Sequence, residues 1–129
     1  MSISAFAHLI LDVKSIERSL RFYQDELGCE LVNSQELDGH RIAYVSAQGL
    51  HLLFVEQPTE DQLSLTNRGD GIVLNFHMPN LASYAGTLKT KNIPVLRKLE
   101  EPAYGEKTLL ILDPDGYTIL LSEPVGTLH

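Results

Sequence analysis

The spacing of hydrophobic residues changes several times along the first half of the chain. Residues 5–13, AFAHLILDV, are rich in apolar and β-branched residues and too short for an isolated helix, which predicts a strand. From Ser15 to Gly28 apolar side chains recur at helical spacing, with Ser15 placed to cap the start of a helix and Gly28 its end. Glycine-containing turns then separate three further predicted strands, at residues 29–37, 40–47 and 50–56.

The second half of the chain repeats this order of elements. Residues 71–78, GIVLNFHM, predict a strand, and Asn80 is placed to cap a helix over residues 81–91. Between the two halves, residues 58–70 are polar, have no clear period and predict a linker. The Asp-Pro-Asp-Gly turn joins the last two of three closing strands, which are predicted at residues 95–99, 107–112 and 117–123.

One predicted strand has a similar sequence in both halves of the chain. GLHLLFVE at residues 49–56 matches GYTILLSE at residues 116–123 in its glycine, one leucine and its closing glutamate. We therefore predict two β-α-β-β-β modules, at about 4–57 and 71–124, within a single domain spanning residues 1–129. The fold class is α+β, with a curved mixed sheet around a shared cavity and the helices on its convex side.

Each first strand has one purely apolar face and one mixed face, because side chains alternate across a strand. Helix packing needs continuous apolar surface, so we expect the apolar faces beneath the helices and the mixed faces toward the cavity. The apolar faces are Ala7, Leu9, Leu11 and Val13 in the first module, and Ile72, Leu74, Phe76 and Met78 in the second. The mixed faces are Phe6, His8, Ile10 and Asp12, and Val73, Asn75 and His77.

The hairpins extend these faces to neighbouring strands. In the first module, His51, Leu53 and Val55 are expected on the same side as Ile42 and Tyr44. In the second module, we place Thr118, Leu120 and Ser122 on the same side as Lys107, Leu109 and Ile111. A register slip of one residue would move every one of these side chains to the other face.

Composition and charge exclude several classes of function. The 129 residues carry a net charge of -7, which disfavours nucleic-acid binding because phosphate requires a basic surface. No apolar run approaches the roughly 20 residues of a membrane span. The single cysteine, Cys29, is interpreted as a packing residue and fits a reducing, cytoplasmic setting. No catalytic triad, carboxylate pair or phosphate-binding glycine loop stands out, so no catalytic residue is predicted.

The chain resembles the vicinal-oxygen-chelate superfamily, which includes glyoxalase I, extradiol dioxygenases and bleomycin-resistance proteins. The resemblance is carried by AHLILDVKSIERSLRFYQDELGCELV and LILDPDGYTILLSEP, in which SLRFYQDELG and DPDGY are the most specific runs. It covers nearly the whole chain. It also implies a homodimer, because members of the superfamily commonly associate in pairs.

The resemblance further implies where a metal ion would be held. Members with a metal place one ligand on the first strand and one on the last strand of each module, usually histidine and glutamate. In this chain the four positions are occupied by His8, Leu53, Val73 and Leu120. Only the histidine has a donor atom, whereas a catalytic metal usually needs three protein ligands. We therefore predict no metal and no cofactor.

A relocated site built from His8, His51 and His77 is the alternative. Same-face neighbours in a strand are about 6.5 to 7 Å apart, farther than a ligand shifts without rebuilding the sheet. Glu56 and Glu123 are interpreted as charges at strand ends and not as the missing metal carboxylates.

The leading hypothesis is a metal-free protein that binds and sequesters a small molecule, similar to bleomycin-resistance proteins. The acidic balance and apolar walls suit a cationic or aromatic ligand. A metal-dependent glyoxalase-like or dioxygenase-like enzyme, and a regulatory module with a filled cavity, are the alternatives. The residues predicted to line the ligand site are His8, Asp12, Tyr44, His51, Leu53, Val73, His77, Lys107, Leu120 and Ser122.

Overall fold

The computed structural model describes residues 1–37, 39–57, 71–102 and 105–124. The chain divides into two compact units, residues 1–66 (unit 1) and 67–129 (unit 2), and each is described by itself. The predicted linker, residues 58–70, lies outside the described residues. Within the part of the chain that is described, no helix has the length and apolar character needed to cross a membrane.

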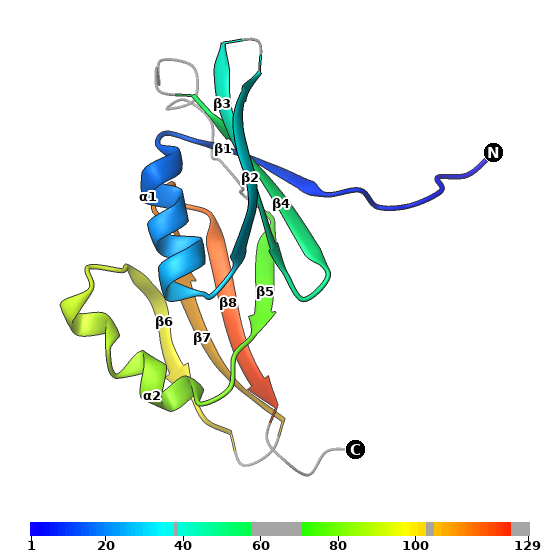
Figure 1. Cartoon of the computed structure of the whole chain (residues 1–129). Helices are drawn as coiled ribbons and strands as arrows, with labels where there is room; N and C mark the ends of the chain where they lie inside the picture. The colour runs from blue at the N-terminus through cyan, green and yellow to red at the C-terminus, as the bar shows by residue number, and fades with distance from the viewer. Residues whose placement is uncertain (38, 58–70, 103–104, 125–129) are drawn as a thin grey trace. The chain divides into compact units, whose positions relative to one another are not determined.

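Unit 1 is a four-stranded mixed sheet with one helical segment (Figure 1). The strand order is β1-β4-β3-β2, with β1 parallel to β4 and the other neighbours antiparallel. The elements are β1 (Leu9–Val13), α1 (Ile16–Leu20), its π-helical continuation η1 (Arg21–Glu26), β2 (Glu30–Leu37), β3 (His40–Ala47) and β4 (Leu50–Glu56). The predicted strand at 5–13 is shorter in the structure, where it begins at Leu9.

Unit 2 repeats this topology, with strand order β5-β8-β7-β6 and β5 parallel to β8. Its elements are β5 (Val73–His77), α2 (Leu81–Ala85), the 3₁₀ turn η3 (Leu88–Thr90), β6 (Val95–Glu100), β7 (Glu106–Leu112) and β8 (Thr118–Pro124). The helix predicted over 81–91 is interrupted at Gly86 and Thr87, two residue types of low helix propensity. The α+β class and the two β-α-β-β-β modules are confirmed. The cavity predicted to be shared by the two modules depends on how the units are placed, and it stays a prediction.

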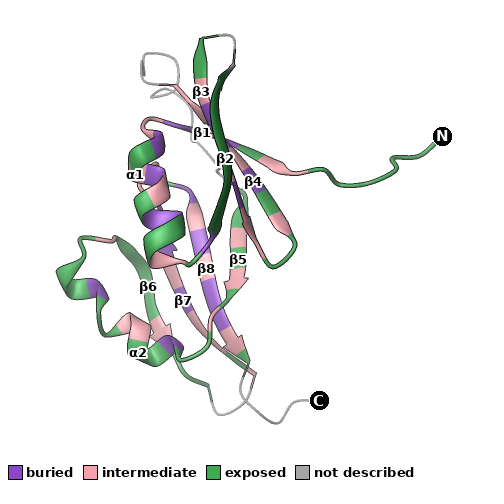
Figure 2. Ribbon diagram, viewed as in Figure 1, coloured by how far each residue is buried: buried purple, intermediate pink, exposed green. Residues whose placement is uncertain are grey.

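The core of unit 1 lies between the helical segment and one face of the sheet (Figure 2). Leu11 and Val13 of β1 are buried there, as the alternation of the first strand predicts. Tyr23 of η1 is fully buried, and its ring centroid lies 5.0 Å from that of Phe54 on β4. Ser15 caps α1 as predicted, because its Oγ accepts a hydrogen bond from the Arg18 backbone N–H at 3.2 Å. Burial raises the pKa of the Cys29 thiol, in keeping with a packing role.

The core of unit 2 corrects one part of the sequence prediction. Leu109 and Ile111 of β7 are buried with Ile119 and Leu121 of β8, on the side of the sheet that α2 covers. The register pairs Leu110, and not Leu109, with Leu120. The predicted face of this hairpin was therefore wrong by one residue.

The cause of this shift is the turn between β7 and β8. The Asp113 N–H donates to the Tyr117 carbonyl at 2.9 Å, so the loop includes Tyr117 and is one residue longer than the Asp-Pro-Asp-Gly motif indicates. The buried Asp113 carboxylate fixes this geometry by accepting hydrogen bonds from the N–H groups of Asp115 and Tyr117, both at 2.8 Å. By contrast, Gln48 and Gly49 form a two-residue turn with positive φ values of 47° and 90°, which gives the register expected for the first hairpin.

The glutamates that close the repeated strands cap the two helices. The Glu56 carboxylate accepts a hydrogen bond from the Ile16 backbone N–H at 2.9 Å. Glu123 accepts from the N–H groups of Asn80 at 2.9 Å and Leu81 at 3.0 Å. These donors have no partner within the helix, and the positive end of the helix dipole favours an anion there. The two glutamates are thus charges at strand ends, as predicted, and they also cap the helices.

Asn80 occupies the N-cap position of α2 but does not cap it with its side chain. Its backbone is left-handed, with φ 57° and ψ 44°, and its side chain makes no capping hydrogen bond. The sequence therefore predicted the N-cap position correctly, but the prediction that the Asn80 side chain caps the helix is wrong. Glu123, 43 residues away in the chain, supplies the carboxylate instead.

We predict that Glu123 makes the folded state sensitive to acid. Hydrogen bonds from the Leu81 and Asn80 N–H groups lower the pKa of Glu123 below its ordinary value of 4.5. Because the folded-state pKa is the lower one, this stabilisation is complete above pH 4.5 and is lost as pH falls through the folded value. Urea unfolding of the wild type and Glu123→Gln between pH 7 and pH 3 measures the effect: the variant starts less stable and loses less on acidification. The exposed Glu30→Gln is the matched control, and parallel curves for wild type and Glu123→Gln would contradict the assignment.

Candidate functional site

In unit 1 the sheet face opposite α1 carries the mixed side chains predicted from the first strand. Ile10, Leu53 and Tyr44 lie side by side across β1, β4 and β3, as the strand register shows. Ile10 is 56% exposed. In the next row, Asp12 pairs with Val55, which pairs with Ile42. We call these rows the open face of unit 1.

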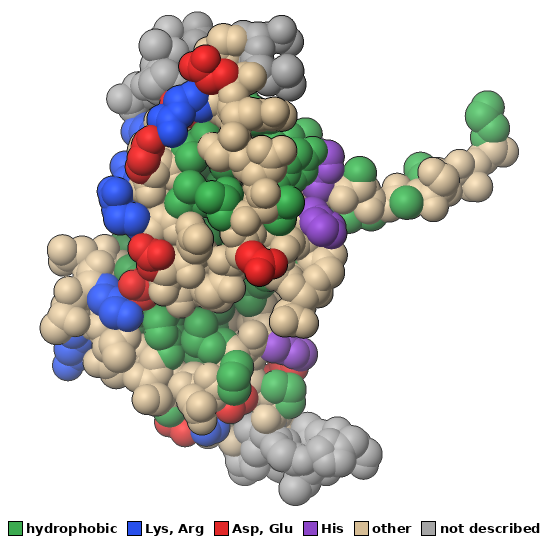
Figure 3. Space-filling model, in the orientation of Figure 1, with side chains coloured by type: hydrophobic (Ala, Val, Ile, Leu, Met, Phe, Trp, Pro, Cys, Tyr) green, Lys and Arg blue, Asp and Glu red, His purple; other side chains and the backbone are tan. Residues whose placement is uncertain are grey.

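His8 and Tyr44 are brought together on this open face. His8 comes directly before β1, and its ring meets the Tyr44 ring edge-on, with centroids 5.3 Å apart. Figure 3 shows histidine side chains beside hydrophobic ones where the N-terminal segment leaves unit 1. The contact positions the imidazole next to the phenol, and both side chains are half-buried. This is the part of the predicted site that the structure assembles within unit 1.

The register places two other predicted residues of unit 1 differently with respect to this pair. His51 is exposed at the start of β4 and faces Ser46 of β3. His8 and His51 directly precede the paired Leu9 and Leu52, so they belong to the same end of the open face. Asp12 lies four residues beyond His8 on an extended chain, about 13 Å away, and does not join the contact between His8 and Tyr44.

Unit 2 has an equivalent open face, on the side of its sheet opposite α2. Its central row is Asn75, Leu120 and Leu110, from β5, β8 and β7. Val73, 52% exposed, belongs to the row before it, together with Thr118 and Leu112. The third row consists of His77, Ser122 and Thr108. Leu120, Val73 and Ser122 thus share a face, as predicted from the alternation of their strands.

Polar contacts on this face involve residues that the sequence prediction did not select. The Ser122 hydroxyl donates to Asn75 Oδ1 at 2.8 Å, and Ser122 is fully buried. His77 Nε2 lies 3.7 Å from Glu106 Oε2, and both side chains are largely exposed. Asn75 was on the predicted mixed face but was not chosen as a site residue. The sequence could have indicated Asn75, because it lies two residues from both Val73 and His77 and therefore shares their face of the strand.

Lys107 lies on the other face of the sheet from Leu120. It pairs with Glu123 in the β7–β8 register, and its Nζ is 3.7 Å from Glu101 Oε1. The corrected hairpin register therefore places Lys107 on the helix-covered side, contrary to the sequence prediction. Thr108 occupies the place on the open face that the prediction gave to Lys107.

The residues present do not fit the metal that the superfamily resemblance implies. Leu53, Val73 and Leu120 all lie on open faces, where the ligands would be required, and none has a donor atom. Among the described residues, no three His, Cys, Asp or Glu side chains are grouped so that they could hold an ion. We therefore derive no chemistry that depends on a metal ion.

A family model for the glyoxalase-like domain matches residues 6–126 of this chain. The protein belongs to this family. It is thereby a member of the vicinal-oxygen-chelate superfamily, as the resemblance indicated. The match spans both units.

Solved structures agree with this fold at low sequence identity. A glyoxylase/bleomycin resistance protein/dioxygenase domain from Frankia sp. EAN1pec has a TM-score of 0.77 and 18% identity, covering 99% of this chain and 97% of that one. Trypanothione-dependent glyoxalase I of Leishmania major has a TM-score of 0.73 and 15% identity, covering 90% and 84%. The fosfomycin-resistance protein FosX of Listeria monocytogenes has a TM-score of 0.72 and 18% identity, covering 97% of each chain. The glyoxalase-like family thus supplies a fold that serves both enzymes and resistance proteins.

We predict that Ser122 and Asn75 stabilise the open face of unit 2 as a coupled pair. Their hydrogen bond joins β8 to β5, and a bond of this kind contributes about 1 kcal/mol to the free energy of unfolding. A double-mutant cycle with Ser122→Ala, Asn75→Ala and both together measures the coupling by urea unfolding. Additive single effects would show that the contact contributes nothing to stability.

Proposed function

We propose that this protein binds a small organic ligand without a metal ion, as a sequestration or resistance-type member of the glyoxalase-like family. The supporting observation is that Leu53, Val73 and Leu120 occupy the open faces at the positions where the superfamily resemblance puts metal ligands. Aliphatic side chains offer dispersion contact and exclude water, whereas they cannot donate electrons to an ion. The change of residue type favours binding of an apolar surface.

The side chains of the open faces define the ligand chemistry that fits. Ile10 and Val73 are each more than half exposed, so covering one of them contributes roughly 1 kcal/mol. The Tyr44 ring provides a flat surface for stacking and a hydroxyl for one directed hydrogen bond. We therefore infer a partly aromatic, amphipathic ligand. A positive charge on it agrees with the net charge of -7.

A metal-dependent enzyme of the glyoxalase or dioxygenase type is the second candidate. His8 favours it, because this histidine occupies the first-strand ligand position and its ring is held against Tyr44. An ion there would need at least two further ligands from elsewhere. The homodimer and the cytoplasmic setting implied earlier are also proposals, and light scattering of the purified protein measures the first.

Metal content separates the two candidates. We expect protein purified without a histidine tag to carry well under one equivalent of nickel, zinc, iron or manganese by mass spectrometry, and to show no change in melting temperature when these ions are added. His8→Ala is the matched variant. An ion near one equivalent per chain that disappears in His8→Ala would overturn the binder in favour of the enzyme.

Ligand binding is tested by a thermal-shift screen of aromatic and cationic compounds. A ligand at one hundred times its dissociation constant stabilises the folded state by about 2.7 kcal/mol, which raises the melting temperature by several degrees. We expect Leu120→Glu to abolish the response to a compound that stabilises the wild type, because a bound apolar surface would have to desolvate the new carboxylate. Glu30→Gln, on the exposed β2 strand, should respond like the wild type. A screen with no response from the wild type would support the regulatory alternative.

A further inference from the structure

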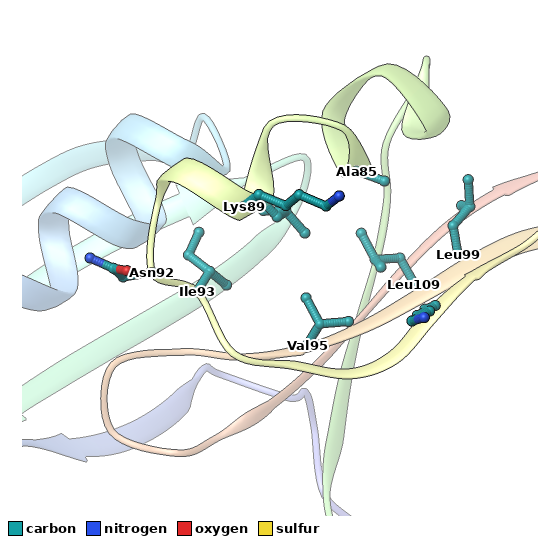
Figure 4. Close-up of a pocket in the computed structure, with 9 residues that line it drawn as sticks. Ala85, Lys89, Asn92, Ile93, Val95, Leu99 and Leu109 are labelled. Carbon is teal, nitrogen blue, oxygen red and sulfur yellow. The ribbon is translucent and has the colours of Figure 1, made fainter.

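A cavity of about 550 Å³ lies in unit 2, on the opposite side of the sheet from the open face. It is formed between the helical segment α2–η3 and strands β6 and β7 (Figure 4). Its walls are mostly apolar and are formed by Ala85, Leu88, Ile93, Val95, Leu99 and Leu109. This volume falls within the range of roughly 300–1,000 Å³ that small-molecule sites occupy.

Unit 1 carries a buried ring at one position that lines the cavity in unit 2. Between α1–η1 and its sheet, unit 1 buries Phe22 and Tyr23, and Tyr23 packs on Phe54. The position 65 residues after Tyr23 holds Leu88, which lines the cavity. A leucine in place of a buried ring leaves more room beneath the helical segment at this point. The exposed Val95 and Lys98 in its walls show that the cavity opens to solvent along β6.

Two irregularities in β6 bring a positive charge to the cavity. The register of β6 against β7 shifts between Val95 and Arg97 and again between Arg97 and Glu100. A β-bulge redirects side chains from the face that strict alternation would give them. Lys98 and the adjacent Leu99 consequently both line the cavity, whereas Arg97 pairs with Leu110 of the open face.

The charge around the cavity is opposite to that of the whole chain. The net charge of the chain is -7, but residues 81–99 contain four basic residues and no aspartate or glutamate. Lys89 lies on the helical side of the cavity with its ammonium group extended toward Ala85 (Figure 4). Neither Lys89 nor Lys98 forms an ion pair with another described residue, whereas Arg97 and Lys107 each lie 3.7 Å from a glutamate oxygen. Two cations therefore flank an apolar cavity without a counter-charge from the described chain.

We propose that this cavity is a second binding site, which takes a small amphipathic carboxylate. The apolar body of the ligand lies against Leu88, Ile93 and Leu109, and its carboxylate lies between Lys89 and Lys98. An ammonium group attracts a carboxylate more strongly beside an apolar wall than in bulk water, because less solvent screens the pair. Within unit 2 this cavity is separate from the open face, which lies on the other side of the sheet.

The experiment compares two probes of equal chain length, octanoate and octan-1-ol, by heteronuclear NMR titration of the full chain. We expect octanoate to shift the amide signals of residues 85–99 and to bind about tenfold more tightly than the alcohol. The double variant Lys89→Gln and Lys98→Gln should lose this tenfold preference and bind both probes alike. Added salt should weaken octanoate binding to the wild type and leave the alcohol unaffected.

Two further variants separate the site from unspecific effects. Lys91→Gln is the matched control, because Lys91 belongs to the same segment but its Nζ lies over the Tyr84 ring at 5.3 Å and does not line the cavity. It should keep the full preference for octanoate. Val95→Trp fills the cavity with a ring and should prevent binding of both probes, with its folding verified by thermal unfolding. The proposal is overturned if octanoate leaves residues 85–99 unshifted, if the alcohol binds the wild type equally well, or if Lys91→Gln weakens octanoate as much as the double variant does.

Discussion

The carboxylate at the end of each repeated strand holds the helix of its own unit against one face of the sheet. The Glu56 carboxylate accepts a hydrogen bond from the Ile16 N–H, and the Glu123 carboxylate accepts hydrogen bonds from the N–H groups of Asn80 and Leu81. Each contact joins the start of a helix to the end of the last strand, and in doing so it fixes which sheet face is covered. The recurrence of this contact at equivalent places explains why the chain carries the same strand twice, with a glutamate closing both copies.

Once one face is covered by the helix, the other face of the sheet is left open. The covered faces bury Leu11, Val13, Ile119 and Leu121, whereas the open faces leave Ile10 and Val73 more than half exposed. The positions where the superfamily resemblance puts metal ligands carry aliphatic side chains at Leu53, Val73 and Leu120, and all three lie on the open faces.

The two units also show how a duplicated module diverges. Unit 1 fills the space beneath its helix with Phe22, Tyr23 and Phe54, and its helical segment continues without a break from α1 into η1. Unit 2 has smaller side chains there, and its helix is interrupted at Gly86. A cavity lined by Leu88, the counterpart of Tyr23, lies beneath the second helical segment, and the bulged edge strand β6 adds Lys98 to it. The same topology thus gives a packed core beneath the helical segment of unit 1 and a cavity beneath that of unit 2.

The sequence by itself determined the order of elements, the two modules and the buried face of β1, whereas Ile72 on the corresponding face of the second module is 54% exposed. These properties depend on residues close together in the chain: alternation places Leu11 and Val13 on one face, and Ser15 caps a helix three residues away. The tertiary structure alone decided the register of the β7–β8 hairpin, because Asp113 extends the turn by one residue and so exchanges Lys107 for Thr108 on the open face. It also decided that Glu123, and not Asn80, caps α2, and that both Lys98 and Leu99 line one cavity. Such features arise from contacts between distant residues or from bulges, which local periodicity does not encode.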